Sequence, residues 1–171
     1  MSITELQTLL TTDADAFCQL AAPLTEAEFA HQPDGRWSVG DTAQHLYLSA
    51  RPVLRLVTGH RDVFAQWGNA EGPSRTYDVI EKTYRKVLGQ GVKAPANLSP
   101  RPEDVPADKA TMLIRLTDTY LAIANQLAGW SDEELERYRI PHPALGLISV
   151  REMVYFIGIH TRHHMAVLQA Y

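Results

Sequence analysis

The sequence predicts an all-α protein that folds as a four-helix bundle. Four long segments repeat apolar residues at the spacing of an amphipathic helix, and no segment shows a convincing strand alternation. The links differ in length, because about fifty residues separate the second long helix from the third. Such a link can cross over along the bundle. We therefore expect an up-down-down-up arrangement whose crossover carries an extra helix, with residues 1–171 forming one domain.

The first long helix is expected from Ile3 to about Ala21. Apolar residues keep helical spacing over this stretch, and Pro23 ends it. A single helical turn can begin at Thr25, because Glu28 follows three residues later as in a capping box. The sequence Pro33-Asp34-Gly35 then predicts a turn.

The second long helix is expected to begin after Ser38 and to reach about Thr58. Ser38 is the N-cap, and Asp41 sits at the capping-box position, where its charge also suits the helix dipole. Gly59 ends the helix, and Pro52 inside it is expected to cause a kink or a local irregularity. The predicted inward face carries Asp41, Thr42, His45, Ser49, Pro52 and Leu56.

The long link and the third helix follow. A helix is expected from about Tyr77 to Leu88, and the proline-rich stretch from Ala94 to Pro106 should be extended. The third long helix runs from about Ala107 to Leu127, with Met112, Leu116, Ile123 and Leu127 facing inward. A short helix can lie at Ser131–Tyr138, and Ile140–Leu147 is expected to be a loop.

The last helix begins with the capping box of Ser149 and Glu152 and can run to the chain end. At 100° per residue, two of its histidines lie near the centre of the apolar arc and His163 lies near its edge. The inward arc holds Met153, Phe156, Ile157, His160, His164, Val167 and Leu168. The far side holds Arg151, Glu152, Arg162 and Gln169.

His160 and His164 form an i, i+4 pair that points into the core. Two imidazoles there need four nitrogens satisfied, and one metal ion would meet half of that need. The alternative is a pair of core histidines with ordinary hydrogen bonds. His45 is the candidate third ligand, since a polar cluster inside a bundle is costly unless something occupies it. It lies seven residues after the helix cap, which matches the level of His164 if the two helices are antiparallel.

Composition excludes several classes of protein. The net charge of −4 indicates neither nucleic-acid nor anionic-membrane binding. We expect no signal peptide, since the first residues lack a basic segment followed by an apolar run, and no stretch is long enough to span a bilayer. The single cysteine, Cys18, cannot form an internal disulfide, which fits a cytoplasmic protein.

The sequence resembles the DinB family of metal-binding four-helix bundles, which includes thiol-dependent transferases. The resemblance rests on Trp37-Ser38 followed by His45, and on His160-Thr-Arg-His-His164 followed by an aliphatic turn. It extends over the whole chain in the order of its helices. It implies a bundle, commonly dimeric, that holds a divalent metal on three histidines, for which His45, His160 and His164 occupy the matching positions.

The resemblance leaves the reaction open. Some members of the family are thiol S-transferases or a thiol-dependent isomerase that use a low-molecular-weight thiol, and others are metal-dependent hydrolases. In either case three neutral imidazoles leave coordination positions for a thiol or a water, which becomes a nucleophile near neutral pH. Zinc or nickel is the expected metal and iron a further candidate, since imidazole suits all three. A non-catalytic metal-binding or dimerisation module is the alternative.

Several other residues near the predicted site have both a possible functional role and a simpler structural explanation. Asp41, Ser49 and Gln44 could support the metal or contact substrate, although Asp41 also suits a helix start and Gln44 a solvated position. Trp37 could wall the pocket or anchor the core, and Arg162 is expected to be exposed. Four histidines are expected to be non-ligands: His31, His60, His142 and His163. Of these, His163 could serve as an alternate ligand.

We predict a homodimer, because the apolar face of the helix at 77–88 must be buried on its own bundle or against a second chain. Light scattering at micromolar concentration checks this prediction. A mass of about 19.1 kDa, that of one chain, would contradict it.

Overall fold

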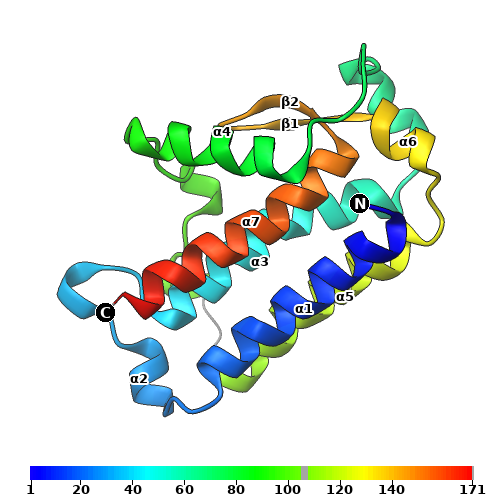
Figure 1. The fold of residues 1–171 in the computed structure, drawn as a ribbon. Helices are drawn as coiled ribbons and strands as arrows, with labels where there is room; N and C mark the ends of the chain where they lie inside the picture. Colours follow the sequence, from blue (N-terminus) through cyan, green and yellow to red (C-terminus); the bar gives the residue numbers. More distant parts are fainter. Residues whose placement is uncertain (105–107, 171) are drawn as a thin grey trace.

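The computed structural model describes residues 1–104 and 108–170. As predicted, four long helices form a bundle (Figure 1): α1 (Ile3–Ala21), α3 (Val39–Thr58), α5 (Lys109–Leu127) and α7 (Val150–Gln169). The shorter helices are α2 (Glu26–Ala30), α4 (Tyr77–Gly89) and α6 (Asp132–Arg137). Strands β1 (Arg139–His142) and β2 (Gly146–Ser149) precede α7, and 3₁₀ turns lie at Pro33–Gly35, Arg61–Trp67, Ala96–Leu98 and Pro102–Asp104.

The helices begin where the sequence places their caps. Full capping boxes form at the predicted Thr25, Ser38 and Ser149, each with an acidic side chain three residues later. Helix α5 begins one step after its N-cap Asp108, whose carboxylate accepts from the amide of Thr111. The predicted start at 107 and the end of the predicted extended stretch lie outside the described residues.

Contacts between the helices give their directions. Gln7, near the start of α1, donates to the carbonyl of Ala124 near the end of α5, so these two helices run in opposite directions. Helices α3 and α5 run in the same direction, because the guanidinium of Arg115 lies over the ring of Tyr47 in the first halves of both helices. Farther along, Trp130 donates to a carbonyl at the end of α3. The long crossover makes this parallel pairing possible.

Helix α3 is continuous through Pro52, which lines the cavity together with other residues of the predicted inward face but is itself exposed. Its buried side chains follow a slightly rotated arc that includes Leu46, Ala50, Val53 and Val57. The rotation arises because α3 packs extensively against α5 as well as against α7. The inward residues predicted for α5 are all fully buried: Met112, Leu116, Ile123 and Leu127.

The loop predicted at Ile140–Leu147 is instead part of a β-hairpin. The pairs are Arg139↔Ser149, Ile140↔Ile148, Pro141↔Leu147 and His142↔Gly146. Gly146 has φ 74°, a left-handed conformation that favours glycine. Each strand has only four residues, which is too short for a clear two-residue period, and Pro141 and Pro143 resembled loop signals. The hairpin and α4 lie on the side of α7 away from α1 and α5 (Figure 1).

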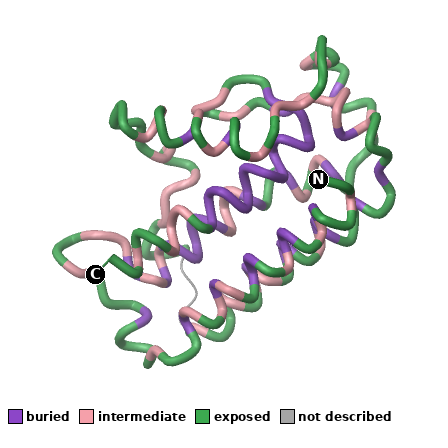
Figure 2. Tube along the Cα trace, in the orientation of Figure 1, coloured by how far each residue is buried: buried purple, intermediate pink, exposed green. Residues whose placement is uncertain are grey.

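The first half of α7 is buried on all sides, which corrects the helical-wheel prediction. Arg151 and Glu152 were expected to face outward, yet each is only 5% exposed. Every residue from Val150 to Thr161 is buried, and Figure 2 shows this stretch as the longest buried run in the bundle. The wheel assumes one inward direction, whereas α1, α3, α4, α6 and the hairpin all pack around this helix.

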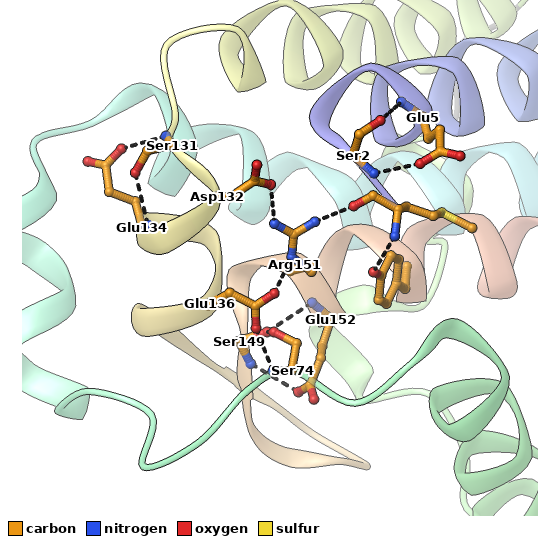
Figure 3. A network of polar contacts seen from close by, with 12 residues as sticks. Ser2, Glu5, Ser74, Ser131, Asp132, Glu134, Glu136, Ser149, Arg151 and Glu152 are labelled. Carbon is orange, nitrogen blue, oxygen red and sulfur yellow. Dashed lines mark hydrogen bonds and ion pairs between the residues drawn. The ribbon is translucent and has the colours of Figure 1, made fainter.

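Two charged side chains, Arg151 and Glu152, hold the start of α7 in this position. The guanidinium of Arg151 donates to the carbonyl of Met1 and to Asp132, and its Nε lies 2.6 Å from Glu136 in an ion pair without hydrogen-bond alignment (Figure 3). The carboxylate of Glu152 accepts from the backbone amide, Nε and Nη2 of Arg75 at 2.7, 2.9 and 3.1 Å. These contacts attach the N-terminus, α6 and the segment before α4 to α7.

Replacing Arg151 with methionine should lower the free energy of unfolding by about 2 kcal/mol, because several charge-assisted hydrogen bonds are lost. The loss stays moderate since Asp132 is 71% exposed and can be hydrated. Urea unfolding followed by circular dichroism measures the change. Arg85→Met is the matched control: Arg85 forms an exposed pair with Glu81 and should contribute less than about 0.5 kcal/mol. Equal losses in both variants would contradict the role given to Arg151.

Candidate metal centre

Three histidine side chains from α3 and α7 converge on one point. His45 Nε2 lies 3.0 Å from His160 Nε2, and His164 Nε2 lies 3.1 Å from the same atom. The ligand atoms of all three residues lie within 4.8 Å of one another. His45 comes from the first half of α3 and the other two from the second half of α7, so these helices are antiparallel at the site. The structure thus brings together the three residues singled out in the sequence.

The tautomer of His45 is fixed from outside the cluster. Its Nδ1 lies 2.6 Å from the carbonyl oxygen of Leu98. A carbonyl only accepts, so Nδ1 must carry the proton and donate it. The neutral ring therefore presents an unprotonated Nε2 to the other two histidines, which is the arrangement that orients metal-bound imidazoles in proteins.

Hydrogen bonds within the cluster cannot satisfy all three nitrogens. If His160 Nε2 carries a proton, it can donate to His45, but it then has no lone pair to accept a proton from His164. If His160 Nε2 carries no proton, it can accept a hydrogen bond from His164. Its lone pair then lies opposite the lone pair of His45 Nε2, and these two atoms cannot form a hydrogen bond. One cation placed among the three Nε2 atoms would pair with every lone pair at once. The donor set therefore fits a divalent metal held by imidazole nitrogens.

Burial keeps these imidazoles neutral. It lowers the pKa of His164 to about 3, with the nearby His45 and His163 adding to the effect. Burial also lowers the pKa of His160 well below its usual range, and that of His45 to a smaller extent because the Leu98 carbonyl favours the protonated form. At neutral pH all three rings are therefore in the uncharged form that metal ligation requires.

Trp37 forms one wall of the site. Its ring centroid lies 4.8 Å from that of His45 and 6.1 Å from that of His164, to which it is nearly parallel. The side chain also lines the cavity next to the histidines and is half-buried. Of the two roles considered for Trp37, the structure shows the one at the pocket.

The other polar candidates on α3 differ in their roles. Asp41 does not line the cavity, and its Oδ2 accepts from Ser38 and from Gln32 at the helix start. Gln44, for which a solvated position was considered, is only 2% exposed. Ser49 lines the cavity, but its hydroxyl oxygen is inaccessible. Within the described residues neither Gln44 Oε1 nor Ser49 Oγ has a hydrogen-bond partner.

Two further histidines line the cavity without joining the convergent cluster. His163 has its ring 5.1 Å from that of His164 and 5.9 Å from that of Tyr84. His142, which sequence reasoning dismissed as a loop residue, reaches the cavity from β1. No pattern in the sequence marked it, because its position depends on the hairpin. His31 and His60 are exposed and lie outside the cluster.

The cavity beside the cluster has a volume of about 520 Å³. Its walls come from α3, α4, α7, the hairpin and the segment 92–98. Most of the lining is aliphatic, aromatic or proline. Among the described lining residues Lys93 is cationic and none is acidic. A cavity of this size and character suits a small organic molecule.

Comparison with known proteins gives the family. The sequence model of the DinB superfamily matches residues 9–168. This chain belongs to the DinB superfamily. Its neighbours among solved structures share the bundle, and none of the curated protein sequences matches the chain significantly. In the described part of this DinB protein, no helix combines the length and hydropathy needed to cross a bilayer.

Two solved structures superpose on nearly the whole DinB chain. YfiT from Bacillus subtilis, described as a probable metal-dependent hydrolase with an unusual four-helix bundle topology, gives a TM-score of 0.63 at 16% identity, covering 97% of this chain and 85% of that one. TT2238, described as a four-helix bundle protein, gives a TM-score of 0.61 at 15% identity, covering 99% of this chain and 100% of that one. At such low identity the similarity shows the fold.

Proposed function

We propose that this DinB protein is a metal-dependent hydrolase whose metal is held by His45, His160 and His164. The observation that carries the proposal is the convergence of three neutral Nε2 atoms at the wall of an apolar cavity. The description of YfiT as a probable metal-dependent hydrolase supports this choice of reaction. A divalent metal in the cluster would supply Lewis acidity for attack by water.

The residues of the chain prepare the site in three ways. The carbonyl of Leu98 holds His45 in the tautomer that points a lone pair at the cluster. The ring of Trp37 packs against His45 and limits the positions open to it. The apolar walls bind the body of a substrate and exclude bulk water, which strengthens electrostatic interactions at the histidines.

The donor set limits the choice of metal without fixing it. Three imidazoles without a thiolate or a carboxylate in the cluster suit zinc, nickel and iron. We propose zinc or nickel, with iron as a further candidate. Elemental analysis of the protein purified without added metal measures which ion it retains.

The reaction is tested on zinc-loaded protein with two kinds of substrate, an ester for hydrolysis and a thiol with an electrophile for transfer. Hydrolysis of p-nitrophenyl esters should exceed the rate of buffer with free zinc, and it should vanish after chelation and in His164→Ala. Conjugation of glutathione to an electrophile, without ester hydrolysis, would replace the hydrolase with a thiol transferase. Bound metal with neither reaction would favour a non-catalytic metal-binding module.

His163→Ala should leave metal occupancy nearly unchanged. The ring of His163 packs against Tyr84 and lies outside the convergent cluster, so its loss removes no ligand. Zinc per chain, measured by elemental analysis after loading and dialysis, checks the prediction, with His164→Ala as the matched neighbour. A large loss of zinc in His163→Ala would make His163 a ligand in place of one of the three.

A further inference from the structure

The hairpin holds His142 in one tautomer. Its Nδ1 accepts hydrogen bonds from the backbone amides of Ala144 at 3.1 Å and of Leu145 at 3.0 Å. Both donors are amide N–H groups, so Nδ1 must carry a lone pair, and the neutral ring must carry its proton on Nε2. Turning the ring over would break both hydrogen bonds. The ring is also packed edge-to-face on Phe156, with centroids 4.1 Å apart.

The other nitrogen of His142 is free to bind a ligand. Nε2 has no hydrogen-bond partner among the described residues, yet it is not one of their buried polar atoms without a partner. It is therefore accessible, and the ring lines the cavity. Burial lowers the pKa of His142 to about 4, so the ring stays uncharged at neutral pH. A neutral N–H group in a fixed direction is a hydrogen-bond donor for an uncharged acceptor.

The rest of the cavity defines the kind of molecule that presents this acceptor. The walls are predominantly apolar, with residues such as Leu46, Val53, Leu56 and Ile157 on the bundle side. No described lining residue is acidic, so nothing there would pair with a cationic ligand. An apolar body gains most from this lining, and an oxygen acceptor on it would satisfy the otherwise unpaired Nε2–H group.

We propose that the cavity takes a small apolar molecule with a carbonyl oxygen, and that His142 is a substrate-binding residue whose Nε2–H donates to this oxygen. The proposal rests on the proposed function in one respect: it names the substrate class for the same site. It does not require the metal, because the donor and the apolar walls belong to the protein. The competing role for His142 is purely structural, as an acceptor that closes the hairpin turn.

Two substitutions separate the two roles. In His142→Asn, the side-chain oxygen can still accept from the amides of the turn, as in an Asx turn, but nothing reaches the position of Nε2. In His142→Gln, the amide nitrogen can take the place of Nε2, while the acceptor for the turn is lost. A substrate-binding role predicts weaker binding in the asparagine variant, and a structural role predicts a less stable hairpin in the glutamine variant only.

The binding experiment uses two probes of nearly equal shape, acetophenone and α-methylstyrene, which differ in C=O against C=CH₂. NMR titrations at pH 7.5 of the metal-free protein, and of the zinc-loaded protein for comparison, measure both affinities. In His142→Asn, acetophenone should bind roughly fivefold to tenfold more weakly, as expected for one lost hydrogen bond, and α-methylstyrene should change less than about twofold. His142→Gln should keep acetophenone within about threefold of the wild type. Equal changes for both probes would overturn the proposal.

Two further measurements keep the result decisive. Long-range ¹H–¹⁵N spectra of the wild type should show His142 protonated at Nε2, and protonation at Nδ1 would overturn the proposal whatever the variants do. Zinc content is measured in every sample. Retained zinc without a difference between the probes refutes the role of His142 and leaves the metal site standing. A wild type that binds no zinc refutes the proposed hydrolase instead.

Discussion

Replacing His160 with alanine should abolish tight binding of a divalent metal and leave the helical bundle folded. His160 Nε2 lies between the other two ligand atoms, at 3.0 and 3.1 Å, so its loss leaves two separated nitrogens. Structural zinc sites bind zinc with a free energy of about 10–16 kcal/mol, which their four ligands share. The loss of one ligand therefore implies a loss of affinity of roughly 100- to 1000-fold. Alanine has the highest helix propensity, so α7 should persist.

Competition with a zinc-binding dye measures the affinity, and far-ultraviolet circular dichroism measures the helix content. His31→Ala is the matched control, because this histidine is exposed and lies outside the cluster. The metal-free variant should melt close to the metal-free wild type, since the removed ring could not satisfy both of its neighbours. Full zinc occupancy in His160→Ala would refute the three-histidine site.

Acid should release the metal and lower the melting temperature together. Protons compete with the metal for each imidazole. In the folded protein burial holds the pKa of His45, His160 and His164 below the value near 6.5 expected for an unfolded histidine, with His164 at about 3. Well above pH 6.5 both states are neutral and this contribution to stability is complete. Below it the unfolded chain binds protons that the folded chain does not, so stability falls toward pH 3.

The metal adds to this slope because it binds the folded state. We expect full occupancy at pH 7.5 and release of the metal only as the pH falls toward the lowered pKa values of the ligands, about 3 for His164, with the melting temperature decreasing over the same interval. A chelator at pH 7.5 should reproduce the part of the decrease that is due to the metal without protonating any group. Occupancy that stays flat down to pH 3 would contradict the ligand set. A melting temperature that a chelator leaves unchanged would trace the acid sensitivity to other groups.

The bundle and the three converging histidines could be predicted because local rules decide them. Ser38 and Ser149 fix where two helices begin, and helical spacing from those points sets the level and direction of His45 and His160. The long crossover then allows the antiparallel pairing that brings these levels together. Such features depend on short stretches of sequence and on connection lengths, which can be read directly.

The misplaced residues depend on contacts between distant segments. Arg151 and Glu152 are charged residues on the predicted outer side of a helix, and they are buried because the chain start, α6 and Arg75 supply partners for them. His142 enters the cavity only through the register of a hairpin with two four-residue strands. Periodicity along one helix contains no information on these partners.

The end of burial in α7 would give a metal bound at the three histidines a route of exchange. The buried run stops at Thr161, and from Arg162 to Ala170 the residues are half-buried or exposed. Helix ends with few buried contacts open at a free energy far below that of global unfolding. Fraying of the last turns would detach His164 while His45 and His160 stay in place. His164 is then the ligand that dissociates first, and the exchange rate of zinc should follow the amide hydrogen exchange of these turns.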